Sequence, residues 1–290
     1  MLLPPLVRAV SGTRLRAVTT SYTTVMSLAA ALGAAAAVPV ANALGSSTLG
    51  LGTWVLPALL ALVVWMMASR GAGVDTALSA PASTDRRPLP SGTWALTGFF
   101  ALQAITSYII MGWLPTITVD IGIQPARAGV LLGVVMMASI PAGIAAVSIS
   151  HTLTGVRIGV VAVSLTTIAG ALGLLLAPAV APETWAVLLG IGMAAFPLIL
   201  ALIARAGSGA ADSARVSGVA QGVGYALATF GPLGAGAWHG LGGDWGPVLV
   251  VLALAAAVQL GVGLAITRAQ RRAEADAVAS AALAVTDQPA

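Results

Sequence analysis

The stretch AVTTSYTTVMSLAAALGAAAAVPVANALGSSTLGLGTWVLPALLALVVWMMAS, residues 17–69, carries no charged side chain from one end to the other. A helix needs about 20 residues to cross roughly 30 Å of hydrocarbon at 1.5 Å per residue, so this stretch is long enough for two crossings. GSSTLGLG, residues 45–52, is rich in turn-forming residues and predicts the connection. The stretch therefore predicts two membrane-spanning helices, at 20–43 and 52–69.

The rest of the chain has the same character. Of all 290 residues, 58% are hydrophobic and 8% are charged, with a mean hydropathy of +0.99, whereas soluble domains have about 25% charged residues. Most of the chain must therefore lie in lipid, and we predict an all-α integral membrane protein with eight transmembrane helices. The six further neutral runs predict helices at 93–115, 126–149, 156–178, 183–204, 214–238 and 245–267.

Arginines should mark helix ends, because a guanidinium at the bilayer centre costs about 2.5–3.5 kcal/mol. When the connections are assigned alternately to the two sides of the membrane, one side holds only Arg127. The opposite side holds Arg8, Arg14, Arg16, Arg70, Arg86, Arg87, Arg157, Arg205, Arg215, Arg268, Arg271 and Arg272. By the positive-inside rule the second side is cytoplasmic. We therefore predict a multi-pass protein of the inner or plasma membrane with both termini in the cytoplasm.

Composition also narrows the chemistry. The chain has no cysteine and no lysine, so it has no disulfide, thiolate nucleophile, P-loop or Schiff base. Two histidines, His151 and His239, make a poor metal site. The arginines are scattered rather than clustered, which argues against nucleic acid. We expect no cofactor, no metal and no nucleic-acid partner, and a monomer in the lipid bilayer.

The chain also repeats itself. LVRAVSG, residues 6–12, shares the frame Arg-Ala-x-Ser-Gly with IARAGSG, residues 203–209, and GTWVLPALLALV from Gly52 resembles GDWGPVLVVLAL from Gly243. If this is a duplication, the opening residues correspond to the tail of a helix and the chain is truncated at its N-terminus. Chance resemblance between apolar helices remains the alternative.

This repeat predicts four parts. Residues 1–69 are the remnant of an N-terminal helical half, a stub of one helix plus two spans. A cytoplasmic linker follows at 70–92. Residues 93–267 form a C-terminal six-helix half, and 268–290 form a cytoplasmic tail.

Several segments resemble the major facilitator superfamily and, within it, the cyanate transporter (CynX/NimT-like) family. They are MLLPPLVRAV, FFALQAITSYIIMGWLPTITVDIGIQPARAGVLLG, GIGMAAFPLILALIARA and ARVSGVAQGVGYALATFGPLGAG. The resemblance runs from about residue 2 to residue 268. It implies a partial major facilitator fold, the last two helices of the N-terminal half plus a complete C-terminal half. The family's first helices, with an Asn-Leu-Arg-Pro-type segment, are missing.

The resemblance implies a secondary active transporter of a small polar or anionic, cyanate-like solute, working by alternating access between two helical halves. An inert truncated fragment or a membrane scaffold is the alternative. A membrane-embedded enzyme is less favoured, because neither histidine has the nucleophile or acid that catalysis needs. We therefore expect that the chain is not an enzyme.

A solute in such a transporter lies near the membrane midplane, where polar side chains replace its water. Polar residues at helical spacing predict the solute site, although they also suit interhelical hydrogen bonding. These candidates are Gln221, Tyr225, Thr229, Gln103, Ser107, Tyr108, Tyr22 and Ser27. The candidates for gating or packing are Gly218, Gly222, Gly224, Pro232 and, at the outer mouth, Asp120.

Overall fold

The computed structural model of the chain describes residues 39–69, 88–207 and 209–286, with isolated positions between 21 and 36. The chain divides into two compact units, Leu2–Leu89 and Pro90–Ala290. Every described element is an α-helix, which confirms the all-α prediction for this part of the chain. We describe the two units separately.

The first unit contains α3 (Ser47–Gly52) and α4 (Val55–Ser69). The Ser46 side chain caps α3 by accepting a hydrogen bond from the Leu49 N–H at 3.3 Å. The connection predicted at 45–52 is therefore mostly helical, and its turn is centred on Gly45, whose positive φ of 62° suits glycine. Only 6% of the apolar segment Thr48–Met67 is buried within the protein, as expected for a helix that faces lipid.

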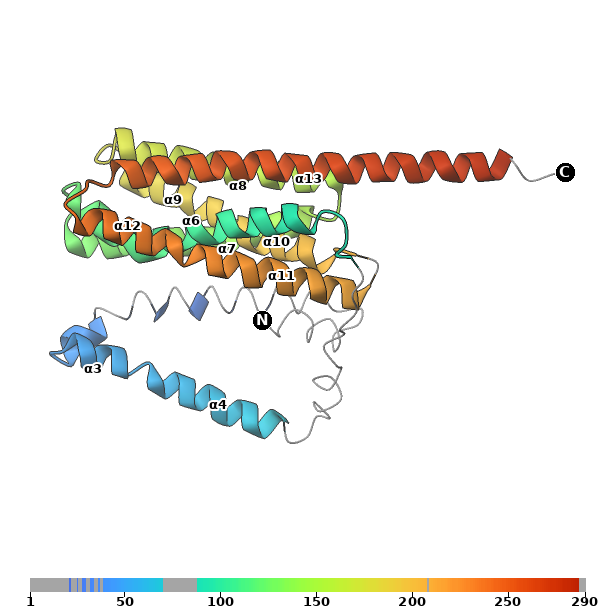
Figure 1. Ribbon diagram of the computed structural model, residues 1–290. Coiled ribbons are helices and arrows are strands. Elements are labelled where there is room, and N and C mark those ends of the chain that lie inside the picture. Colours follow the sequence, from blue (N-terminus) through green and yellow to red (C-terminus); the bar gives the residue numbers. More distant parts are fainter. Residues whose placement is uncertain are drawn as a thin grey trace. The chain divides into compact units, whose positions relative to one another are not determined.

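The second unit is a bundle of antiparallel and parallel helices (Figure 1). Its helices are α6 (Thr93–Asp120), α7 (Pro125–Ile149), α8 (Leu153–Leu176), α9 (Pro182–Met193), α10 (Ala195–Ala204), α11 (Ala210–Ala228), α12 (Phe230–Gly240) and α13 (Gly246–Thr286). The aromatic pair Phe99 and Phe100 of α6 and the aliphatic pair Leu198 and Ile199 of α10 are fully buried and form the centre of its core.

Six helical segments in the described part of the chain are long and apolar enough to cross a membrane. They correspond to six of the eight predicted spans. Half of the residues of the predicted span at 20–43 lie outside the described residues. The described span at 214–238 is divided between α11 and α12 and is not among these six segments.

Two predicted helices are interrupted, and each interruption lies a few residues before a proline. α9 ends at Met193, four residues before Pro197, and α11 ends at Ala228, four residues before Pro232. Proline has no N–H for the carbonyl four residues earlier and its ring clashes with that carbonyl. The prediction of single helices at 183–204 and 214–238 is therefore wrong in this respect.

Pro115 behaves differently. It is the last residue of the helix predicted at 93–115, but it lies inside α6, which continues to Asp120. That prediction is wrong by a little more than one turn, and the longer helix carries Asp120 on its last turn.

The helix ends of the second unit meet in two separate groups. In one group, the Arg205 guanidinium at the end of α10 donates to the carbonyl and hydroxyl of Ser150 at the end of α7, at 2.5 and 3.2 Å. In the other group, Arg127 on the first turn of α7 donates to Glu183 on the first turn of α9, with 2.9 Å between Nε and Oε1. Arg127, the one arginine that the sequence places on that side of the membrane, is thus paired with a carboxylate.

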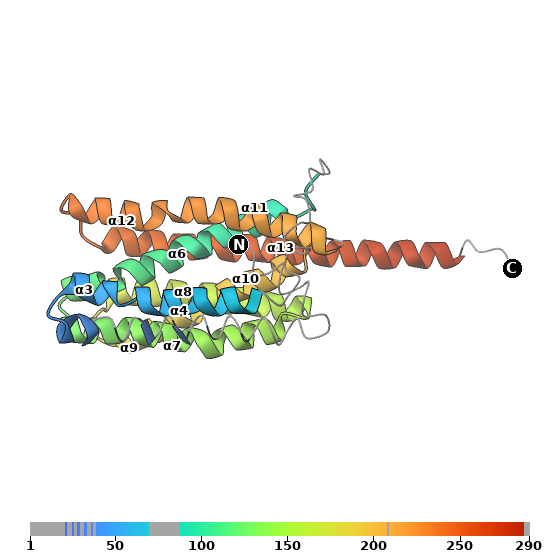
Figure 2. The same ribbon diagram turned by 90° about the horizontal axis from the view of Figure 1, so that it is seen from below.

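α11 and α12 run alongside α6 in the same direction (Figure 2). Three glycines of α11 and α12 face α6 in matching order: Gly224 against Phe100, Gly231 against Ile105 and Gly236 against Trp113. A Cβ atom at these glycines would lie 2.4, 2.9 and 2.5 Å from those side chains. Glycine therefore permits the close approach of these two helical segments to α6.

Candidate functional site

The polar residues predicted on α6 form a pair along one helix face. Gln103 is 1% exposed, and its Nε2 donates to the Ser107 hydroxyl at 2.9 Å. The two residues are one turn apart, a spacing at which helical side chains meet. The bond is made within α6 rather than between helices, so it leaves the second hydrogen of the Gln103 amide for another acceptor.

α11 repeats this arrangement. Gln221 Nε2 donates to the Ser217 hydroxyl at 2.6 Å, and both side chains are buried. Thr229, between α11 and α12, donates from its hydroxyl to the Tyr225 carbonyl at 3.1 Å. Ser217 was not among the predicted residues, although its spacing of four from Gln221 could have indicated it.

Two predicted tyrosines meet between α6 and α11. The rings of Tyr108 and Tyr225 stack with their centroids 6.2 Å apart and an interplanar angle of 20°. The rings of Phe100 and Tyr225 meet edge to face, with their centroids 5.1 Å apart. Tyr108 is 39% exposed, so the stacked pair is continuous with the buried aromatic core on one side and is accessible on the other.

This tyrosine pair lies near the middle of α6. Tyr108 is 15 residues after Thr93 and 12 before Asp120, the two ends of α6. At 1.5 Å per residue these separations are about 22 and 18 Å. The aromatic pair is therefore close to the middle of the span, where the solute site was expected.

The glycines predicted beside these residues differ in their surroundings. Gly224 lies against Phe100, whereas a Cβ at Gly218 or Gly222 would meet no described atom within 4 Å. The Pro232 carbonyl accepts a hydrogen bond from Trp113 Nε1 at 2.9 Å, which joins α12 to α6.

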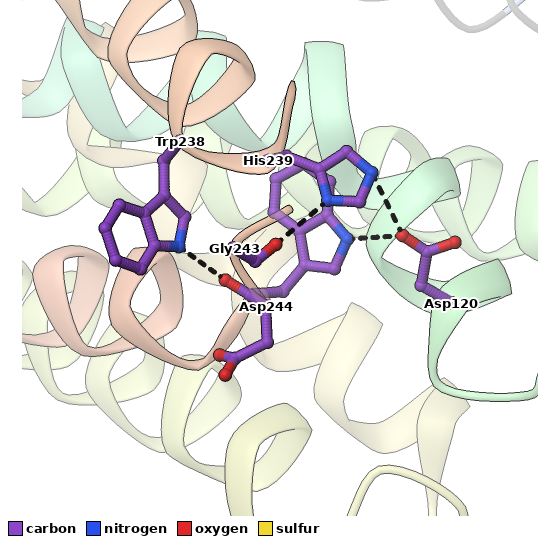
Figure 3. Close-up of polar contacts among 6 residues, drawn as sticks. Asp120, Trp238, His239, Gly243 and Asp244 are labelled. Atoms are coloured by element: carbon purple, nitrogen blue, oxygen red, sulfur yellow. Dashed lines mark hydrogen bonds and ion pairs between the residues drawn. The ribbon is translucent and has the colours of Figure 1, made fainter. Parts of the chain in front are cut away.

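The outer candidate Asp120 belongs to a polar and aromatic cluster (Figure 3). Its Oδ2 accepts a hydrogen bond from Trp245 Nε1 at 2.7 Å and lies 3.5 Å from Nε2 of His239. Trp245 is only 4% exposed, so it is a buried anchor of this cluster.

Two predicted residues, Tyr22 and Ser27, lie outside the described part of the chain. Within the described ranges no group of three or more histidine, aspartate or glutamate side chains is arranged to hold a metal ion.

The helices and their polar interior define a multi-pass membrane protein, and its relatives are transporters. The chain is 34% identical to the 2-nitroimidazole transporter of Escherichia coli (strain K12) over 88% of its own length. It is 30% identical over 81% to the uncharacterized transporter YycB of Bacillus subtilis (strain 168), and 24% identical over 67% to the cyanate transport protein CynX of E. coli (strain K12).

These similarities place the chain in the NimT/CynX-like group of the major facilitator superfamily. The chain spans 65%, 59% and 50% of the lengths of these three relatives. No family model and no solved structure matches it.

Proposed function

We propose that this chain forms the solute-binding part of a secondary active transporter that moves a small polar or anionic solute by alternating access between two helical halves. The observation that carries this proposal is the similarity to the 2-nitroimidazole transporter along 88% of the chain. The membrane-spanning helices of the second unit support it.

We further propose that Tyr108, Tyr225, Gln103 and Gln221 contact the solute. The named solutes of two relatives, 2-nitroimidazole and cyanate, are small π-bonded molecules. An aromatic face suits a flat π-system, and amide hydrogens suit its oxygen and nitrogen atoms. Both kinds of group lie within the α6 and α11 pair, which supports a solute of this class.

The domain organisation and orientation complete the proposal. Residues 93–267 act as a six-helix half, 1–69 as part of the other half, 70–92 as their cytoplasmic linker and 268–290 as a cytoplasmic tail. The protein works as a monomer with its termini in the cytoplasm. Arg157, Arg205 and Arg215 lie near one set of helix ends, and Arg268 lies on α13 just past the predicted span at 245–267, which supports this orientation.

A flux assay tests the site. The full chain is reconstituted in liposomes and the uptake of 2-nitroimidazole and of cyanate is measured separately. Tyr225→Leu removes the stacked ring, and we expect uptake to fall about tenfold, the equivalent of about 1.4 kcal/mol. Tyr225→Phe keeps the ring and isolates the contribution of the hydroxyl.

The matched control is Leu227→Ala, a truncation of an exposed side chain on the same helix, which should leave uptake near the parent rate. Equal uptake by the parent and Tyr225→Leu would remove Tyr225 from the site. If the folded parent moves neither solute, the scaffold or fragment alternative is favoured over transport by this chain.

A further inference from the structure

Three helices of the second unit, α6, α8 and α13, bury polar side chains in the interior of the bundle. Ser164 of α8 is fully buried, Gln259 of α13 is 2% exposed and Thr106 of α6 is 3% exposed. The Ser164 Oγ and the Thr106 Oγ1 have no hydrogen-bond partner within the described residues. A buried hydroxyl without a partner costs free energy, so its presence in a folded protein requires an explanation.

Contacts near both ends of the α8 and α13 pair fix the register of these two helices. A Cβ at Gly263 of α13 would lie against Val160, near the start of α8, and a Cβ at Gly246 would lie 3.6 Å from Leu175 Cδ1, near its end. α13 therefore runs antiparallel to α8. A step forward along α8 corresponds to a step backward along α13.

One helical turn from the Gly263 contact, the facing positions are polar. Ser164 follows Val160 by four residues, and Gln259 precedes Gly263 by four residues. Residues four apart share a helix face. Ser164 and Gln259 therefore face each other, about 6 Å along the helix axes from Gly263.

α6 brings Thr106 to the same region. A Cβ at Gly263 would also lie 3.0 Å from Phe99 Cε2, and Thr106 follows Phe99 by seven residues, which is two turns along one face. α6 is antiparallel to α13, because Asp120 at its far end bonds to Trp245, next to the start of α13.

The lean of the side chains reduces the remaining separation. Along the bundle the Thr106 backbone lies about 4.5 Å beyond that of Gln259, three residues at 1.5 Å each. Side chains lean toward the N-terminus of their own helix. In two antiparallel helices these directions are opposite, so Thr106 and Gln259 lean toward each other's level.

A water molecule suits these groups. A hydroxyl has one donor and two acceptor lone pairs, and a glutamine amide has both donors and an acceptor. No charged residue lies within four positions of Thr106, Ser164 or Gln259 along their helices, so an ion would have no counter-charge there. Buried waters make about three hydrogen bonds, typically to groups that are otherwise unsatisfied.

We propose that Ser164, Thr106 and Gln259 bind a water molecule between α6, α8 and α13, and that this water links the three helices at the middle of α6. The site explains the two hydroxyls that have no partner in the described part of the chain. It lies on the α6 face marked by Phe99, whereas the stacked tyrosines lie between α6 and α11. Its test does not depend on transport.

Two substitutions that remove little more than a hydroxyl test the site. The full chain is placed in lipid nanodiscs and its thermal unfolding is measured for the parent, Ser164→Ala and Thr106→Val. We expect each substitution to lower the midpoint by about 2–4 °C, the shift that corresponds to one hydrogen bond in a protein of this size. A hydroxyl with no partner at all would give the opposite result, and an unchanged or raised midpoint in either variant would overturn the proposal.

Thr167→Val is the matched control. Thr167 is also buried on α8, but its hydroxyl donates to the Val163 carbonyl at 2.8 Å within the same helix. That carbonyl already accepts a helical N–H, so the control should lower the midpoint less than Thr106→Val. An equal or larger decrease in Thr167→Val would overturn the proposal.

NMR distinguishes a bound water from a direct bond between Ser164 and Gln259. The full chain carries isotope-labelled glutamine in lipid nanodiscs, and Gln259→Leu assigns the side-chain amide signals of Gln259. We expect cross-relaxation between these amide hydrogens and a long-lived water, weakened in Ser164→Ala and in Thr106→Val. Gln259 amide hydrogens that show no contact with water in the parent would overturn the proposal, as would a contact that neither substitution changes.

Discussion

Two glycines of α11, only two residues apart, have opposite surroundings. Gly224 faces Phe100, which is fully buried and also contacts Phe196 and Tyr225, whereas Gly222 faces no described atom within 4 Å. Replacing each glycine by alanine therefore separates the effect of packing on stability from the intrinsic preference of alanine over glycine in a helix, which is about 1 kcal/mol.

Gly224→Ala should lower the free energy of unfolding by roughly 1–3 kcal/mol, because the new methyl would lie 2.4 Å from Phe100 Cδ1 and the ring has no room to move away. Gly222→Ala should leave stability unchanged or raise it slightly. Unfolding in mixed detergent micelles measures both. Equal effects of the two substitutions would show that α11 does not depend on close contact with α6.

At the residue scale, sequence spacing predicted local partners but not distant ones. Gln103 and Ser107 are four residues apart, so helical periodicity indicated their shared face. The contact between Asp120 and Trp245 spans 125 positions, and no periodic pattern connects residues so far apart. It depends on the ends of α6 and α13 meeting after several intervening helices.

At the element scale, the division between α11 and α12 is attributed to Pro232. Pro232→Ala supplies the missing N–H to the Ala228 carbonyl, so we expect the two helices to join into one. Hydrogen–deuterium exchange of the segment 226–236 should then become slower.

Pro115→Ala is the comparison, because α6 is already continuous through Pro115 and its exchange should change much less. Unaltered exchange around Thr229 in Pro232→Ala would assign the interruption to the packing of Gly231 against Ile105 instead.

Charged residues predicted where helices begin better than prolines predicted where helices are interrupted. The predicted starts at 93, 126 and 183 fall within one residue of those of α6, α7 and α9, because the cost of burying a guanidinium or carboxylate fixes where a span can begin. Several predicted spans contain prolines, but their outcomes differ: Pro197 and Pro232 follow an interruption, whereas Pro115 and Pro141 are inside continuous helices. The tertiary surroundings decide between these outcomes.

At the scale of the whole molecule, the two groups of helix ends predict two compartments. The chain has no cysteine, so single-cysteine variants report on one site each. Thr154→Cys and Val180→Cys place exposed thiols at opposite ends of α8. A membrane-impermeant maleimide should label Val180→Cys in intact cells and Thr154→Cys only after permeabilisation. Labelling of both thiols in the same compartment would contradict the proposed orientation.

The length of α13 has a mechanical consequence. Its 41 residues extend about 61 Å, roughly twice the thickness of the hydrocarbon, so about 30 Å of the helix is in excess of one crossing. Figure 1 shows the C-terminal part of α13 projecting past the other helices of its unit. When a long straight helix tilts, its tip moves further than the part that lies in the membrane. A tilt of about 10° in the membrane would swing its tip by about 5 Å, so a fluorophore attached near Thr286 would amplify small rotations of the bundle into a measurable displacement.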